Sequence, residues 1–232
     1  NVQQLSVWMS RDLLQGKETV VIPLPLYHVY ALTSNLVFMK MGAHTVLVTN
    51  PRDMKAYIHD LKKYPFTIII GVNTLYRALL DAPEFAEVDT RALKLTSAGG
   101  MAVQRVVAER WAEATGVPLI EGYGLTETSP VVISNPLDIE QWTGTIGMPI
   151  PSTDATILDD DGNELAIGEV GEICVRGPQV MAGYWKRPDE TERVFTRDGK
   201  LKEEASAELR AIRTKIHAKR NAIQKLVLTA GT

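Results

Sequence analysis

VPLIEGYGLTETSP, residues 117–130, is an apolar run that ends in two glycines flanking a tyrosine. The apolar part predicts a buried β-strand, and the glycines predict a loop that lets the backbone approach a ligand closely. The loop carries a ring at Tyr123, a hydroxyl at Thr126 and a carboxylate at Glu127. A strand that delivers such groups at its carboxyl end is typical of a parallel sheet with its ligand site at that edge.

Four similar runs precede this stretch and extend the pattern. ETVVIPLPL, AHTVLV, FTIIIG and LKLTSAGG are short, rich in β-branched residues and apolar almost throughout. Such runs suit strands of a parallel sheet that is covered on both faces. The segments between them, at residues 30–42, 52–64, 72–82 and 102–116, predict helices. The predicted fold class is therefore α/β, a mostly parallel sheet with flanking helices.

The pattern changes near Pro130, and three divisions are expected. Residues 1–139 form an α/β subdomain, residues 140–197 a β-rich, barrel-like subdomain, and residues 198–232 a charged amphipathic helical tail. Within the second, ATILDDDGNELAI predicts two strands joined by an Asp-Gly turn. The turn explains the three consecutive aspartates better than a metal site, because the spacing lacks the later glutamate of a calcium loop.

The tail from Leu201 onward has apolar residues at helical spacing and a later half rich in lysine and arginine. A solvated basic face is the simpler interpretation. A helix that binds a membrane surface or a protein partner is the alternative, in which case the chain acts as an interaction module.

Composition limits the classes of function. The 232 residues carry a net charge of −3, so no strong basic field indicates nucleic-acid binding. The single cysteine, Cys174, lies in an apolar run and is interpreted as buried rather than nucleophilic. The sequence has no apolar stretch near the ~20 residues that a membrane-spanning helix requires. We expect a cytoplasmic piece of a longer protein; its oligomeric state is left open.

Two glycine-containing loops are predicted to meet at one edge of the sheet. LTSAGG ends at Gly100, and EGYGLTE ends at Glu127, each directly after a predicted strand. A nucleotide needs a flat surface for its base, close backbone approach and charge neutralisation at its phosphates. Gly99, Gly100, Tyr123, Thr126 and Glu127 supply these features, with Glu127 as an oxygen ligand for magnesium. An ordinary glycine-bearing turn is the alternative.

Several blocks, taken in order, resemble one family. They are PLPLYH at 23–28, TNPRD at 49–53, KYPFTIIIGVNTLYRALL at 63–80, SAGGM at 97–101, EGYGLTET at 121–128, GTIGMPIPS at 144–152 and GEICVRGPQVMAGYWKRPDET at 171–191. Together they resemble the AMP-forming acyl-CoA synthetases of the adenylate-forming ligase family, most closely the bacterial long-chain fatty acid CoA ligases. The resemblance implies a partial N-terminal domain of such a ligase and covers residues 16–197.

The resemblance implies a reaction that uses ATP, Mg²⁺ and coenzyme A. A fatty acid is joined to AMP with release of pyrophosphate, and coenzyme A then displaces AMP. It implies catalytic roles for His28, Thr126 and Glu127, with magnesium on Glu127. It also implies a nucleotide site formed by Gly99, Gly100, Glu121, Gly122, Tyr123 and Thr126, and an acyl channel near Gly71, Val72 and Asn73.

The sequence also departs from this family pattern. A glycine- and threonine-rich phosphate loop is expected before the PLYH block, and nothing similar precedes Pro23. The expected ribose-binding aspartate does not follow the GYW block, and the surroundings of Asp198 do not match it. We therefore expect little ligase activity from the isolated polypeptide. A remnant that binds nucleotide or acyl chains without turnover is the alternative. Peripheral contact with the inner face of the membrane fits the substrate, but no segment requires it.

Overall fold

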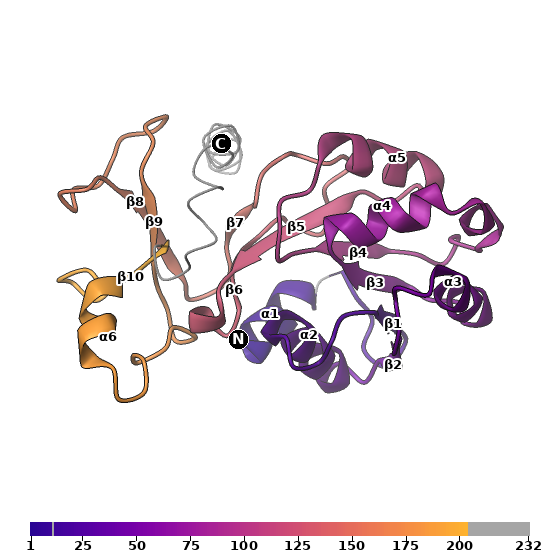
Figure 1. The fold of residues 1–232 in the computed structure, drawn as a ribbon, viewed down its shortest axis with the longest axis horizontal. Helices are drawn as coiled ribbons and strands as arrows, with labels where there is room; N and C mark the ends of the chain where they lie inside the picture. The colour runs from indigo at the N-terminus through magenta and orange to yellow at the C-terminus, as the bar shows by residue number, and fades with distance from the viewer. Residues whose placement is uncertain (11, 204–232) are drawn as a thin grey trace.

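A large, mostly parallel sheet forms the centre of the computed structural model, which describes residues 1–10 and 12–203 (Figure 1). Its strand order is β2-β1-β3-β4-β5-β6-β7, with parallel pairing from β2 to β5 and antiparallel pairing from β5 to β7. The predicted α/β sheet is confirmed. Its strands are β1 (Thr19–Ile22), β2 (His44–Leu47), β3 (Ile68–Gly71), β4 (Leu95–Ala98), β5 (Leu119–Gly124), β6 (Val131–Ser134) and β7 (Met148–Pro149).

Successive side chains of each strand pack alternately into two apolar cores, one on each face of the sheet. In β1, Val21 packs into one core and its neighbours Val20 and Ile22 into the other, and in β3, Ile69 lies opposite Ile68 and Ile70. Side chains of successive strand residues point to opposite faces, so a strand buried on both sides must be apolar throughout. This explains why these runs show no polar alternation.

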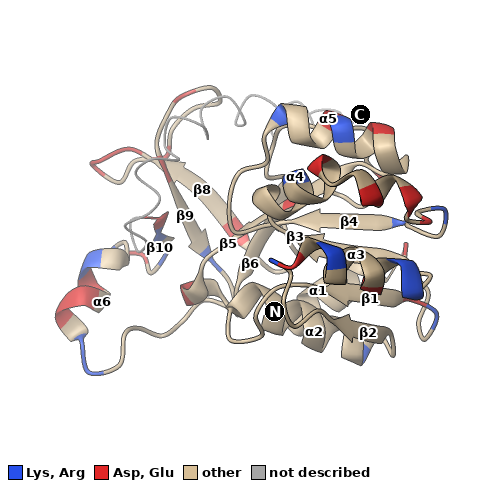
Figure 2. Cartoon of the chain, turned by 45° about the vertical axis from the view of Figure 1, so that its right-hand side comes forward, with Lys and Arg blue, Asp and Glu red and all other residues tan. Residues whose placement is uncertain are grey.

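Helices cover both faces of the sheet. The core on one face includes residues of α1 (Val2–Met9) and α2 (Val29–Lys40). The core on the other includes residues of α3 (Met54–Lys63), α4 (Asn73–Asp81) and α5 (Arg105–Thr115). Charged residues of both signs lie on α3, α5 and α6, whereas the central strands are almost free of charge (Figure 2). No helix among the described residues is long and apolar enough to cross a membrane.

A second, antiparallel sheet of strand order β10-β9-β8 follows the large one. It contains β8 (Asp154–Leu158), β9 (Glu172–Arg176) and β10 (Leu201–Lys202), with α6 (Pro188–Val194) between the last two strands. The predicted Asp-Gly hairpin is only partly correct. The turn forms, but the return segment makes a single bridge, from Leu158 to Glu164, and β9 is the true partner of β8.

The side chain of Asp159 stabilises this turn. The Asp159 carboxylate accepts hydrogen bonds from the backbone N–H groups of Asp161 and Asn163, at 3.0 and 2.8 Å. Such Asx geometry is a common way for aspartate to form a turn. It also holds the pKa of Asp159 below its ordinary value, chiefly through the Asn163 backbone.

The predicted helical tail does not begin at Leu201. That residue is fully buried in the cluster between the sheets and pairs with Val175 of β9. Burial in this cluster therefore outweighs the helical pattern that starts there. The rest of the predicted helix, residues 204–232, lies outside the described residues.

Candidate active site

A pocket of about 320 Å³ lies at the carboxyl ends of β3, β4 and β5, under α1 and α2. It brings together the two glycine-containing loops, as the strand order requires, because β4 and β5 are neighbours. All of the predicted site residues except Glu121 line it: His28, Gly99, Gly100, Gly122, Tyr123, Thr126 and Glu127.

The loop at residues 124–130 displays its polar groups because buried bonds close it at its base. The Thr128 hydroxyl donates to the backbone carbonyl of Pro130 and accepts from the Leu125 N–H at 2.9 Å. Thr128 is fully buried. Between these fixed points Thr126 is exposed and Glu127 half-buried, both at the pocket wall. A closed loop of this kind presents them with little freedom to move.

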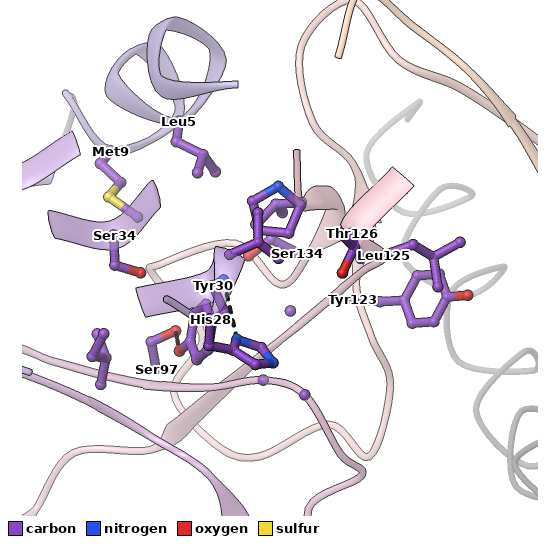
Figure 3. A pocket seen from close by; sticks show the side chains of 18 of the residues that line it. Leu5, Met9, His28, Tyr30, Ser34, Ser97, Tyr123, Leu125, Thr126 and Ser134 are labelled. Carbon is purple, nitrogen blue, oxygen red and sulfur yellow. Dashed lines mark hydrogen bonds between the residues drawn. The ribbon is translucent and has the colours of Figure 1, made fainter. Parts of the chain in front are cut away.

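Tyr123 lies between the pocket and the apolar cluster that joins the two sheets. Its ring is half-buried, and its hydroxyl is buried without a hydrogen-bond partner among the described residues. In Figure 3 the hydroxyl points away from His28 and Tyr30. Burial, followed by the nearby Glu203, raises the pKa of Tyr123 well above its ordinary value, so the ring stays neutral. A neutral aromatic ring at the pocket wall can stack on a base but makes no ionic contact.

Glu121 supports the neighbouring loop instead of lining the pocket. Its buried carboxylate accepts from the Val103 N–H at 3.1 Å and from the Trp142 indole N–H at 2.9 Å. At the next residue of the same loop, the Gln104 N–H donates to the side-chain oxygen of Asn73, the first residue of α4, at 2.9 Å. These two acceptors hold the segment that follows Gly100, so their effect on a ligand is exerted through the loop.

Replacing Glu121 by glutamine is expected to lower the free energy of unfolding by about 1–3 kcal/mol. Glutamine has one acceptor oxygen where the carboxylate uses two, so an N–H group of either Val103 or Trp142 loses its partner. Urea denaturation measures the change. Glu113→Gln, on the exposed side of α5, is the matched control, and an equal loss in both variants would contradict this role.

His28 caps the start of α2 and lines the pocket. Its Nδ1 accepts a hydrogen bond from the Tyr30 N–H at 3.2 Å, the dashed line at His28 in Figure 3. A nitrogen that accepts carries no proton, so the proton of the neutral ring lies on Nε2. The side chain is exposed, which leaves Nε2–H able to donate to an anionic ligand. In this state His28 is a hydrogen-bond donor, and its capping nitrogen is not a free base.

The opposite end of the pocket is apolar and was not identified from the sequence. Leu5 and Met9 of α1, Phe38 of α2, and Ile70 and Leu95 of the sheet line it. Figure 3 places Leu5 and Met9 far from Tyr123 and Thr126, with His28 between the two ends. The pocket therefore joins a polar loop to an apolar recess. The residues previously expected along the acyl channel, Gly71, Val72 and Asn73, are not among its lining residues.

Tyr30 and Ser97 form a further polar contact inside the pocket that sequence reasoning missed. Their hydroxyl oxygens lie 2.9 Å apart. Burial raises the pKa of Tyr30 to about 12, against the opposing effect of the hydrogen bond with Ser97. The Tyr30 ring also packs against Gly99, where an added Cβ would lie 3.3 Å from it. The sequence offered one signal for this contact: Tyr30 lies two residues after His28, in the first turn of the same helix.

The residues fit a magnesium ion held jointly with a substrate. Glu127 is at the pocket wall, and Oε1 of its carboxylate accepts from the Tyr184 hydroxyl at 2.8 Å. Among the described residues no group of three or more metal-binding side chains occurs. Mg²⁺ is commonly bound by one or two carboxylates, with waters and substrate phosphates completing its shell. A single carboxylate at the wall of the pocket is compatible with that arrangement.

Comparison with known proteins gives consistent matches. The model of the family described as AMP-binding enzyme matches residues 1–185. A long-chain-fatty-acid–CoA ligase of Salmonella typhimurium is 53% identical over 202 residues, which are 87% of this chain and 36% of that protein. The corresponding ligase of Escherichia coli O157:H7 is 53% identical over 196 residues, 84% of this chain and 35% of that protein.

Solved structures agree on the fold. ATP-bound MatB from Rhodopseudomonas palustris superposes with a TM-score of 0.76 at 27% identity, over 87% of this chain and 40% of that one. The chain thus spans about a third of the length of the curated relatives that it matches.

Proposed function

The chain belongs to the AMP-binding enzyme family, and we propose that it is part of a long-chain fatty acid CoA ligase. One observation carries the proposal: a single pocket joins the Tyr123–Thr126–Glu127 loop to an apolar recess beside Leu5, Met9 and Phe38. A fatty acyl-adenylate has the same two halves, a polar nucleotide and an apolar chain. The relatives named above, which are long-chain-fatty-acid–CoA ligases, support the choice of acyl group.

The proposed reaction has two steps. A fatty acid carboxylate attacks the α-phosphate of ATP, and pyrophosphate leaves. The thiol of coenzyme A then attacks the acyl carbonyl, the acyl–oxygen bond breaks, and AMP leaves. The first step is needed because a carboxylate is a poor electrophile, whereas AMP is a good leaving group. The protein contributes mainly by positioning and by stabilising charge on the phosphates.

The residues that line the pocket support the following roles. The Tyr123 ring stacks on adenine, while Gly99, Gly100 and Gly122 allow the backbone to approach the nucleotide. The Thr126 hydroxyl, which is exposed at the pocket wall, donates to the α-phosphate. Nε2–H of His28 donates to the fatty acid carboxylate and orients it toward phosphorus. Glu121 acts indirectly, by holding the loop after Gly100.

Glu127 is proposed to hold Mg²⁺, which offsets the negative charge of the phosphates when it is bound. ATP, coenzyme A and fatty acid are the proposed small-molecule substrates. Their chemistry also suggests where the protein works: ATP and coenzyme A are cytoplasmic, and long-chain fatty acids partition into membranes. We therefore propose a cytoplasmic location with peripheral contact at the inner face of the membrane.

Calorimetric titration with a non-hydrolysable fatty acyl-adenylate analogue, in the presence of Mg²⁺, tests the proposal. We expect the polypeptide to bind the analogue. Tyr123→Ala should weaken binding about tenfold or more, because base stacking contributes ~1–3 kcal/mol per base. Tyr123→Phe retains the ring and should bind like the unmodified chain.

Two further variants give the test its control. Glu127→Ala should also weaken binding, whereas Asp160→Ala, in the exposed turn after β8, should not. A folded polypeptide that does not bind the analogue would contradict the proposed function. Binding without acyl-CoA formation would instead favour the alternative, in which these residues bind nucleotide and acyl chain without turnover.

A further inference from the structure

One segment that follows β9 contacts the pocket loop at Glu127 and Ser129. Residues 177–184 contact it at three successive points. The Ser129 hydroxyl donates to the Gln179 carbonyl at 3.0 Å, the Met181 N–H donates to the Glu127 carbonyl at 2.8 Å, and the Tyr184 hydroxyl donates to the Glu127 carboxylate at 2.8 Å. Glu127 is therefore held through both its backbone and its side chain by the same segment.

Tyr184 is itself fixed in place. Its half-buried ring packs against the apolar cluster that joins the two sheets. Its N–H donates to the Thr191 hydroxyl at 2.9 Å, and that hydroxyl donates to the Arg187 carbonyl at 2.8 Å. Gly183 has φ +150°, and an added Cβ there would lie 2.6 Å from the Thr191 side chain. The phenol thus approaches Glu127 from a preformed turn.

The chemistry of this contact suits a ligand-holding carboxylate. A tyrosine hydroxyl is neutral, so it can orient a carboxylate and leave its negative charge in place. An arginine or lysine at the same position would offset that charge. Within residues 1–10 and 12–203, Glu127 forms no ion pair, and its second oxygen, Oε2, has no hydrogen-bond partner. One oxygen is therefore restrained, while the other is available to a cation.

We propose that Tyr184 is a positioning residue that presets the Glu127 carboxylate for a divalent cation bound with the phosphates of a nucleotide. This inference rests on the proposed function and extends it to a residue outside the pocket lining. Hydrogen bonds to a metal-binding carboxylate orient it, and their loss typically weakens metal affinity 10–100-fold. The same contact ties the turn before α6 to the nucleotide loop.

The test measures magnesium dependence rather than turnover. The polypeptide is titrated calorimetrically with α,β-methylene-ATP, a non-hydrolysable analogue, over a series of Mg²⁺ concentrations. Magnesium should increase the affinity for this analogue. Tyr184→Phe is expected to raise, about tenfold, the Mg²⁺ concentration that gives half of this increase. Binding of the acyl-adenylate analogue in EDTA should stay unchanged. Trp185→Phe, with a side chain 86% exposed, is the neighbouring control and should behave like the unmodified chain.

A double-mutant cycle separates positioning from general damage to the fold. Glu127→Gln removes the charge, and adding Tyr184→Phe to it should raise the Mg²⁺ requirement no further, because the hydroxyl acts through Glu127. An unchanged Mg²⁺ requirement in Tyr184→Phe would overturn the inference and leave the proposed function intact. Equal weakening with and without Mg²⁺ would overturn it in favour of a purely structural contact. No nucleotide binding by the unmodified chain would overturn the proposed function and this inference with it.

Discussion

Gly124→Ala is expected to lower the free energy of unfolding by about 3 kcal/mol or more and to abolish ligand binding. An added Cβ at this position would lie 1.9 Å from the Pro130 carbonyl oxygen and 2.9 Å from the Val131 Cα. These neighbours are backbone atoms in the turn between β5 and β6, so no side-chain rotation relieves the clash. The two strands would have to separate at the point where Thr126 and Glu127 are displayed.

Gly122, two residues earlier on the same strand, is the matched control. There the added Cβ would lie 3.7 Å from the nearest backbone atom, the Ile133 carbonyl oxygen, which is an ordinary contact. Gly122→Ala should therefore unfold at nearly the urea concentration of the unmodified chain, although its methyl group lies at the pocket. Circular dichroism followed through a urea titration measures both. Similar midpoints for the two alanine variants would show that β5 and β6 are not paired as described.

Trp111→Ala is expected to lower the free energy of unfolding by about 3–5 kcal/mol. The Trp111 side chain is fully buried under α5. Its ring lies 5.4 Å from that of Phe85 and 4.7 Å from that of Tyr76, and its indole N–H donates to the Thr96 hydroxyl at 3.1 Å. Truncation leaves a large cavity and an unpaired hydroxyl, against a typical total stability of ~5–15 kcal/mol.

Trp185→Ala is the control, because it makes the same substitution at the surface. Its side chain is exposed, and a change within about 0.5 kcal/mol is expected. Trp111→Phe should fall between the two, because it retains most of the ring packing but loses the bond to Thr96. Tryptophan fluorescence and circular dichroism during urea unfolding measure the three variants. A stable, cooperative Trp111→Ala protein would contradict the proposed core on this face of the sheet.

The sequence predicted the elements of the large sheet well because their signals are local. Four buried residues in a row at β3, or the apolar run before Gly122, are readable within a few residues. The helix predicted from Leu201 onward was wrong at that residue because the deciding contacts are not local. Its apolar spacing is compatible with a helix, but the cluster between the sheets buries that side chain in a strand.

The amino-acid sequence was sufficient to predict the parallel sheet, the two glycine-containing loops at one of its edges, and the family to which their motifs belong. It did not predict which side chains contact one another at that edge. The Glu121 carboxylate binds the N–H groups of Val103 and Trp142 instead of lining the pocket. The Tyr184 hydroxyl binds Glu127, which lies 57 residues earlier in the chain. The physical reason is that periodicity and turn chemistry act between near neighbours, whereas the partner of a buried polar group is fixed only when distant segments pack together.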